Sequence, residues 1–254
     1  MSIKDTDSHN LVAALAIIAT PFALGAFMLA WAPAGQFAAE DPKHDGYVQP
    51  RSINDLVDKT QKSTVTVWCE VSKDNIGQGT AWAIELETAV SDIYPATLIT
   101  NHHVIEDCIG GKGEVTVALP GQNERKAVIV KWDAESDLAV LASKSKYPAL
   151  ALAESDPYPG YWVMAFGSAD GYQGSVAFGN VLNMSGNDIL ITNNISHGNS
   201  GGPLLDNEGN VVGVTTWGSI EEQYNIAVSL DAFCAKILDC QYEYKGEKTW
   251  WDYS

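Results

Sequence analysis

From about residue 62 onward, the chain consists of short apolar runs that are separated by Gly, Asn, Asp and Pro residues. Several of these runs alternate apolar and polar residues, which is typical of half-buried antiparallel strands. A succession of about a dozen such strands predicts an all-β body, built as a sandwich or as a pair of barrels. The runs are "STVTVWCEV", "GTAWAIEL", "ATLIT", "EVTVALP", "KAVIVKW", "LAVLA", "YWVMAFG", "GSVAFGNVLN", "DILITN", "GGPLLD" and "VVGVTTWG".

One segment of this body has helical periodicity instead. In "SLDAFCAKILDC", residues 229–240, Ser229 can cap the N-terminus of a helix. The predicted apolar stripe consists of Leu230, Phe233, Ile237 and Leu238. A short helix near Ile53 to Lys59 is also expected, leading into the body.

The N-terminal part carries an uncharged apolar run, "LVAALAIIATPFALGAFMLAWA", at residues 11–32. At about 1.5 Å per residue, it reaches roughly the 30 Å of a bilayer core. Two interpretations remain open: an uncleaved transmembrane anchor behind a short tail (residues 1–10), or a signal peptide cleaved near "APA" at residues 32–34. The first predicts a single-pass membrane protein whose body lies outside the cytoplasm. The second predicts a secreted or periplasmic protein.

The next segment, residues 33–60, is polar, contains Pro42 and Pro50, and lacks strand periodicity, which predicts a stalk. The folded domain is then expected at residues 61–240, followed by a tail at residues 241–254. The formal net charge of −17 argues against a nucleic-acid partner, because phosphate binding requires clustered Lys and Arg.

The four cysteines are an even number in a chain with a predicted export segment, so disulfides are expected. They do not form a C-x-x-C pair, so a zinc site is not expected, and no cofactor is indicated. The cysteines are Cys69, Cys108, Cys234 and Cys240.

The stretch "HGNSGGPLLD", which begins at His197, surrounds Ser200 with glycines. Glycines allow close approach of a substrate, and successive N–H groups there can converge on one point. The stretch also matches the G-x-S-x-G elbow of α/β-hydrolases, but that fold requires a histidine after the serine, and none follows Ser200. A base upstream of the serine, with an acid between them, gives the known triad order His…Asp…Ser.

The base is expected in "TNHHVIEDC", where His102 and His103 follow an apolar run. Adjacent residues of an extended chain point to opposite faces, so the two rings are not expected to share one role. For the acid, Asp137 stands out because "ESDLAVLA" places it at the mouth of an apolar strand. The other aspartates between base and nucleophile are Asp107, Asp133, Asp156, Asp170 and Asp188.

The motifs "TNHHV", "SDLAVL" and "GNSGGPLLD", in that order, resemble the trypsin-like (chymotrypsin-fold) serine proteases, specifically the HtrA-like branch. "GQGTAWAI", "VMAFGSADGYQGSVAFGNV", "VVGVTTWG" and "NIAVS" extend the resemblance over roughly residues 62–240. The resemblance implies two six-stranded antiparallel barrels with a C-terminal helix. No PDZ-like domain is expected to follow, since only 14 residues come after Cys240.

The resemblance assigns the base to His103 and leaves His102 at a variable position. His103 would take the proton of Ser200, and Asp137 would orient the imidazole. The N–H groups of Gly198 and Ser200 would form the oxyanion hole, each worth about 3–4 kcal/mol in the transition state. Asn199 replaces the aspartate that receives a newly cut N-terminus in digestive trypsins, so activity without cleavage at the domain boundary is expected.

The resemblance further implies a primary substrate pocket around residues 194–198, 215–219 and 225–228. No acid lies at its base, Asn194, so a preference for Arg or Lys is not expected, and Asn225 should narrow the pocket toward small or medium apolar side chains. The substrate-binding set is Asn194, His197, Thr216, Trp217, Gly218 and Asn225. The implied disulfides are Cys69–Cys108, bracing the loop of the base, and Cys234–Cys240, a small terminal loop.

Together these features predict an exported serine endopeptidase that acts on protein or peptide substrates, with a role in cell-envelope protein processing or quality control. The alternative is a catalytically idle binding or scaffold protein with a protease fold. The sequence does not indicate the oligomeric state.

Overall fold

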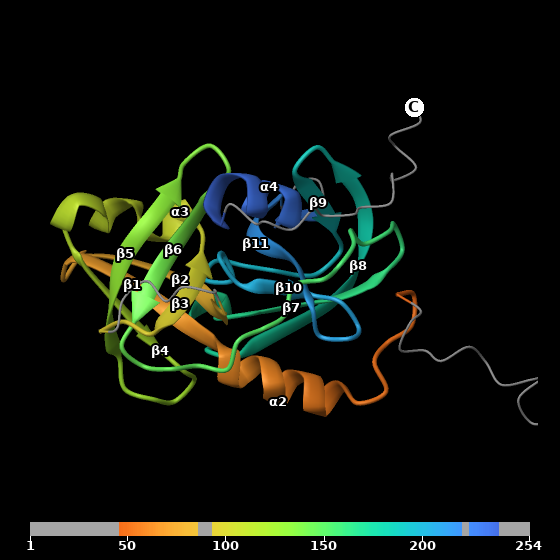
Figure 1. The fold of residues 1–254 in the computed structure, drawn as a ribbon, viewed down its shortest axis with the longest axis horizontal. Helices are drawn as coiled ribbons and strands as arrows, with labels where there is room; N and C mark the ends of the chain where they lie inside the picture. Colours follow the sequence, from red (N-terminus) through yellow and green to blue (C-terminus); the bar gives the residue numbers. More distant parts are fainter. Residues whose placement is uncertain (1–45, 86–92, 220–223, 239–254) are drawn as a thin grey trace, which may run out of the picture. The chain divides into compact units, whose positions relative to one another are not determined.

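A computed structural model describes residues 46–85, 93–219 and 224–238 (Figure 1). The predicted export segment at residues 11–32, the first part of the stalk and the C-terminal tail lie outside the described residues. Within the described ranges, no helix has the length and apolar character needed to cross a membrane.

The first half of the body is a closed barrel whose strands are contiguous in sequence and pair in the order β1-β2-β3-β6-β5-β4. All of its pairings are antiparallel. Its strands are β1 (Thr64–Ser72), β2 (Asn75–Ile84), β3 (Ala96–Thr100), β4 (Glu114–Ala118), β5 (Arg125–Asp133) and β6 (Leu138–Ser143). Between β3 and β4 lie the short helices α3 (His102–Ile105) and η3 (Glu106–Gly111).

The second half is another closed antiparallel barrel, paired in the order β10-β11-β12-β9-β8-β7. Its strands are β7 (Trp162–Gly167), β8 (Ser175–Ser185), β9 (Asp188–Ile191), β10 (Pro203–Leu205), β11 (Val211–Ser219) and β12 (Tyr224–Ser229). A single turn, η4 (Ala169–Gly171), connects β7 to β8. The prediction of two six-stranded antiparallel barrels is therefore confirmed.

The C-terminal helix is confirmed, but it is built in two parts. α4 (Leu230–Phe233) is one α-helical turn, and η5 (Cys234–Leu238) continues it as a π-helical segment. Ser229 lies at the N-cap position, yet its hydroxyl makes no capping hydrogen bond. Leu230, Phe233 and Ile237 are buried as the stripe predicted.

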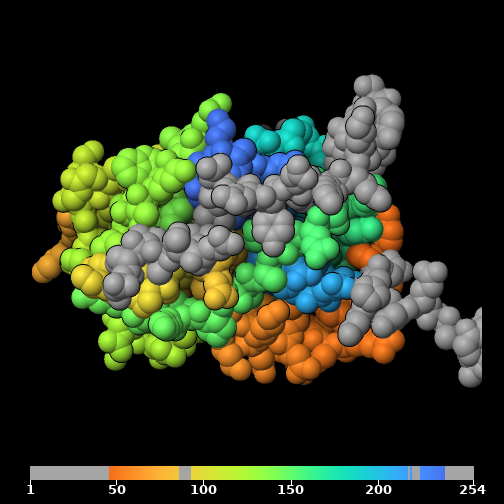
Figure 2. All heavy atoms as spheres, in the orientation of Figure 1, coloured from red at the N-terminus to blue at the C-terminus, as the bar shows by residue number. Residues whose placement is uncertain are grey.

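The helix expected near residue 53 is α2 (Ile53–Ser63), which begins after Ser52, whose hydroxyl accepts a hydrogen bond from the N–H of Asp55. Figure 2 shows α2 along one edge of the molecule. Its Leu56 is 7% exposed and belongs to the main core. The expected boundary between the stalk and the folded domain, at residues 60 and 61, thus falls inside a helix that packs on the barrels.

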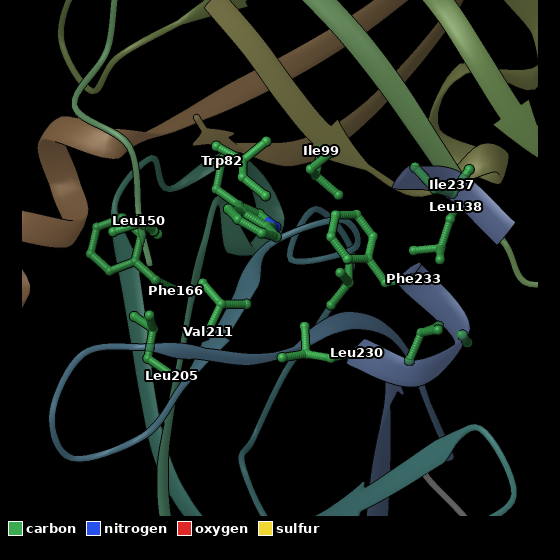
Figure 3. Packing of buried hydrophobic residues seen from close by; sticks show 14 of the residues in the cluster. Trp82, Ile99, Leu138, Leu150, Phe166, Leu205, Val211, Leu230, Phe233 and Ile237 are labelled. Carbon is green, nitrogen blue, oxygen red and sulfur yellow. The ribbon is translucent and has the colours of Figure 1, made fainter. Parts of the chain in front are cut away.

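The main core lies between the two barrels (Figure 3). Trp82, Ile99 and Leu138 come from the first barrel, and Phe166 and Leu205 come from the second. The C-terminal helix completes the cluster, since the ring of Phe233 lies 6.0 Å from that of Trp82. Burial of such large apolar side chains stabilises each by about 1.5–3 kcal/mol, so this cluster fixes one barrel against the other.

Candidate active site

The sequence led us to expect the tandem histidines on an extended strand. In the structure they instead begin the helical turn α3. Successive helical residues are about 100° apart, so the two rings still diverge. His102 is 16% exposed at its side chain and has Nδ1 3.9 Å from Oε2 of Glu106. His103 is 42% exposed and faces Asp137. The two histidines therefore have different partners.

The Asp137 carboxylate holds His103 at two places. Its Oδ2 lies 2.7 Å from Nδ1 of the ring, and its Oδ1 accepts a 2.9 Å hydrogen bond from the backbone N–H of His103. The hydroxyl of Thr216 donates to Oδ2 at 2.6 Å. Burial by itself would raise the pKa of Asp137, but these hydrogen bonds outweigh it and the pKa lies below its usual value. The carboxylate is therefore ionised at neutral pH and keeps the Nδ1 proton on its side of the ring.

The backbone of Asp137 is in the left-handed region, with φ of 53°. Asn101, which is fully buried, donates from Nδ2 to the carbonyl oxygen of Asp137 at 2.7 Å. This bond stabilises a conformation that non-glycine residues adopt only rarely. The sequence did not reveal this role of Asn101, although the residue directly precedes the two histidines.

Three of the aspartates that the sequence left as weaker candidates have other surroundings. Asp107 is exposed in η3, and Asp133 accepts hydrogen bonds from Ser136 in the turn before β6. Asp170 lies in η4 with φ of 47°. Of the described aspartates, Asp137 is the one in hydrogen-bond contact with the ring.

Ser200 lies on the loop between β9 and β10. Its hydroxyl donates to the carbonyl oxygen of Thr216 at 2.7 Å. The loop lies directly against the segment that carries the histidines, because a Cβ on Gly201 would meet the Thr100 hydroxyl at 2.3 Å and the Asn101 nitrogen at 2.9 Å. Thr216 thus contacts both sides of the site, with its hydroxyl on Asp137 and its carbonyl on Ser200.

The peptide groups around Ser200 are oriented by bonds to their carbonyl oxygens. The His197 carbonyl accepts from the N–H of Asp170 at 2.6 Å, and the Asn199 carbonyl accepts from the N–H of Gly202 at 2.9 Å. In a trans peptide the N–H points opposite to the C=O, so the N–H groups of Gly198 and Ser200 point the other way. Within the described ranges, neither N–H donates to another backbone group. Two N–H groups that make no backbone hydrogen bond within the described ranges therefore lie at Ser200, an arrangement that suits an oxyanion hole.

Gly198 has no room for a side chain. Its φ is 92°, and a Cβ there would lie 2.3 Å from the carbonyl oxygen of Ser168. Only glycine fits this position, which explains the glycine before Asn199 in the motif.

The residues expected to line the primary pocket differ in exposure and in their contacts. Asn194 and His197 are exposed, and Gly218 pairs with Asn225 across β11 and β12. The amide of Asn225 donates to the Asn193 carbonyl. Its Oδ1 lies 1.6 Å from where a Cβ on Gly218 would be, so it packs directly over that glycine. The Trp217 side chain lies outside the described part of the structure, so its place in the pocket stays a prediction.

The disulfide between Cys69 and Cys108 is present, with Cα atoms 5.9 Å apart. It joins β1 to η3, the segment that follows the helix of His103. The other expected disulfide involves Cys240, which lies outside the described residues.

Comparison with known proteins identifies relatives of the chain. The sequence model of the trypsin-like peptidase domain matches residues 79–214, which include His103, Asp137 and Ser200. A probable periplasmic serine endoprotease, DegP-like, of Chlamydia trachomatis serovar D is 36% identical over 130 residues, 47% of this chain and 25% of that protein. A protein of the same description from Ectopseudomonas mendocina is 34% identical over 130 residues, 47% of this chain and 26% of that protein. The chain thus spans about a quarter of the length of these relatives.

Two solved structures are also similar. The serine endoprotease from Yersinia pestis has a TM-score of 0.62 at 25% identity, covering 76% of this chain and 67% of that one. The active form of the Rv3671c protease from M. tuberculosis has a TM-score of 0.63 at 23% identity, covering 75% and 87% of the two chains, and shares the fold. Because the family match spans more than half of the 254 residues, the chain belongs to the trypsin-like peptidase domain family.

Proposed function

We propose that the protein is a serine endopeptidase in which Ser200 is the nucleophile, His103 the general base and Asp137 the residue that orients the base. The contact of Asp137 with both Nδ1 and the backbone N–H of His103 carries this proposal. It fixes the ring in the tautomer whose Nε2 is free to accept a proton. An idle scaffold protein would have no need for this fixed tautomer beside a serine and two free N–H groups.

The first half of the reaction forms an acyl-enzyme. Rotation about χ1 of Ser200 transfers its hydroxyl from the Thr216 carbonyl to Nε2 of His103. As the oxygen attacks the substrate carbonyl carbon, His103 takes its proton, and the N–H groups of Gly198 and Ser200 donate to the developing oxyanion. The C–N bond then breaks, and His103 gives its proton to the leaving amine.

The second half repeats these steps with water. His103 removes a proton from a water molecule, the hydroxide attacks the ester carbonyl, and the proton returns to Ser200 as the acid leaves. Throughout, the ionised Asp137 stabilises the imidazolium. The net reaction is hydrolysis of one peptide bond.

Labelling by a fluorophosphonate probe tests this proposal. The wild-type protein should be labelled at Ser200, Ser200→Ala should not be labelled, and Ser185→Ala, which changes an exposed serine at the end of β8, should be labelled like the wild type. Cleavage inside a quenched fluorogenic peptide should follow the same pattern. An unlabelled and inactive wild type would favour the scaffold alternative instead.

We further propose that the protease acts outside the cytoplasm on cell-envelope proteins, either anchored by residues 11–32 or released by cleavage after them. The apolar run, the disulfide and the periplasmic relatives support export. Mass spectrometry of the mature N-terminus in the membrane and soluble fractions decides between the two forms. A protein with an intact N-terminus found only in the cytoplasm would contradict both.

A further inference from the structure

Thr80 of β2 is a fully buried polar residue that the catalytic steps above do not use. Its three hydrogen-bonding groups all have partners at or beside the active site. Its N–H donates to the carbonyl of Ser200 at 2.8 Å, and its hydroxyl donates to the carbonyl of Gly198 at 2.6 Å. Its own carbonyl accepts from the Thr100 hydroxyl at 2.7 Å. Thr80 therefore links the first barrel to the nucleophile loop at the two residues that supply the oxyanion hole.

The loop has no charged side chain to hold it at this point. Asn199, between the two donors, is a neutral amide that is 4% exposed, and its Oδ1 has no hydrogen-bond partner within the described ranges. Gly198 adds freedom, because a glycine with φ of 92° restricts its neighbouring peptides little. Hydrogen bonds to the loop's carbonyls must therefore set the direction of its N–H groups.

Three successive peptides are held in this way, each by a different part of the fold. The first is held at the His197 carbonyl by the N–H of Asp170, and the third at the Asn199 carbonyl by Gly202 and by the Thr215 hydroxyl. The middle peptide, between Gly198 and Asn199, connects the two oxyanion donors. Its carbonyl accepts the Thr80 hydroxyl, and its N–H makes a longer bond of 3.1 Å to the Ser196 carbonyl.

We propose that Thr80 is a positioning residue for the oxyanion hole: its hydroxyl fixes the Gly198–Asn199 peptide and so keeps the N–H groups of Gly198 and Ser200 aimed at one point. This inference rests on the proposed function. The backbone bonds of Thr80 survive substitution, so only the hydroxyl contact is specific to the side chain. Serine can replace it, and valine, which has nearly the same shape, cannot.

Loss of the Thr80 hydroxyl should destabilise the transition state more than the bound substrate. A misdirected donor weakens stabilisation of the oxyanion, whereas a bound substrate with a neutral carbonyl needs it less. Thr80→Val should therefore lower kcat by about 10-fold to 100-fold, with little change in KM. Thr80→Ser should keep most of the wild-type kcat.

The matched control is Thr66→Val. Thr66 is 1% exposed on β1, and its hydroxyl also reaches across the barrels, where it shares a 2.6 Å hydrogen bond with the hydroxyl of Ser168. Loss of this hydroxyl should lower the melting temperature about as much as Thr80→Val does, but should change kcat by no more than about twofold. Thr80→Ala serves in place of Thr80→Val if the valine variant does not fold.

The experiment measures kcat, KM and melting temperature for these variants with a fluorogenic peptide. It also measures inhibition by a peptide aldehyde, which forms a tetrahedral oxyanion on Ser200, and binding of the uncleaved peptide in a Ser200→Ala background. The expected result is a parallel loss of kcat and aldehyde affinity in Thr80→Val, with unchanged affinity for the uncleaved peptide.

Equal kcat for Thr80→Val and Thr80→Ser, or an equal loss in Thr66→Val, would overturn the inference. So would a loss that lies entirely in the affinity for the uncleaved peptide. In each of these cases the wild type is active, so the proposed function stands. If the wild type itself fails to react with a fluorophosphonate, the proposed function fails first, and the inference fails with it.

Discussion

The hydroxyl of Thr216 and the Nδ1 of His103 both contact the same carboxylate oxygen, Oδ2 of Asp137, at 2.6 and 2.7 Å. The first residue belongs to the second barrel and the other two to the first. The acid of the site is therefore stabilised from both barrels at once. The hydrogen bonds of His103, from the same barrel, and of Thr216, from the other barrel, both lower the pKa of Asp137.

Thr216→Val should raise the pKa of Asp137 toward its usual value, because burial would then be opposed by fewer hydrogen bonds. Since the folded pKa of Asp137 is depressed, its carboxylate stabilises the fold above the unfolded pKa, and this contribution is lost as the pH falls through the folded pKa. The variant should therefore lose it at a higher pH than the wild type. Melting temperatures measured from pH 7 down to pH 2 check this, and Thr216→Ser should behave like the wild type. If the melting temperatures of Thr216→Val and the wild type fall at the same pH, the expected role of the hydroxyl is contradicted.

His103→Ala should lower kcat by about 10⁴-fold or more, because the base and the proton donor to the leaving group are both lost. His102→Ala should change kcat by less than about twofold, since its ring faces Glu106 at 3.9 Å, a long and weak contact, rather than Asp137. Steady-state kinetics on one peptide substrate compares the two variants. A severe loss in His102→Ala would reverse the assignment.

Asn225→Gly should widen the primary pocket, because the Asn225 amide packs directly over Gly218. The ratio of kcat/KM for peptides with Phe or Leu before the cleaved bond, relative to Val, should rise by about 10-fold to 100-fold. A peptide library profiled with both proteins measures the change, and Asn225→Ala should give an intermediate profile. Wild-type preference for Phe or Arg would show that Asn225 does not set the pocket size.

Replacement of Cys69 and Cys108 by alanine should lower the free energy of unfolding by about 3–4 kcal/mol, given the 39-residue separation that the bond closes. Activity should also fall, because η3 holds the helix of His103. Urea denaturation with and without a reductant measures the stability. If the double variant is as stable as the oxidised wild type, the disulfide does not brace this loop.

Protein that lacks residues 1–45 should be active without further processing, because Asn199 offers no carboxylate to receive a new N-terminus. Peptidase activity and the intact mass are measured on the same sample. Activity that appears only after cleavage at one bond would refute this prediction. Further removal of α2 should destabilise the fold, since Leu56 is part of the core and its loss alone costs about 2–5 kcal/mol.

Eleven strands could be predicted because alternation and turn residues are local signals, and the expected segments overlap β1 to β11, whereas the segment of β12 was indicated by the family resemblance. Asp137 could be chosen because it opens the apolar strand β6. Its left-handed backbone and the hydrogen bond that it accepts from Asn101 could not be predicted, since that bond joins residues 36 positions apart. Such tertiary contacts leave no periodic trace in the sequence.

Side-chain direction was less predictable than strand position. Thr216 was expected to line the substrate pocket, yet its hydroxyl reaches Asp137. The pairing of β11 with β12 shifts register between Thr215 and Gly218, and such an irregularity re-aims side chains that alternation alone would place elsewhere. The helical turn at the two histidines was missed for a similar reason, because it directly continues the strand-like run "ATLIT".

Each barrel is made of consecutive strands, so each can complete its own pairing without any strand from the other. During synthesis the half that carries His103 and Asp137 is finished before Ser200 has been added to the chain. Domains tend to fold as units in this order. If the proposed function holds, peptidase activity would therefore arise only in the last folding step, when the barrels dock around Trp82 and Phe233. An unfinished or half-folded copy would be harmless to its neighbours.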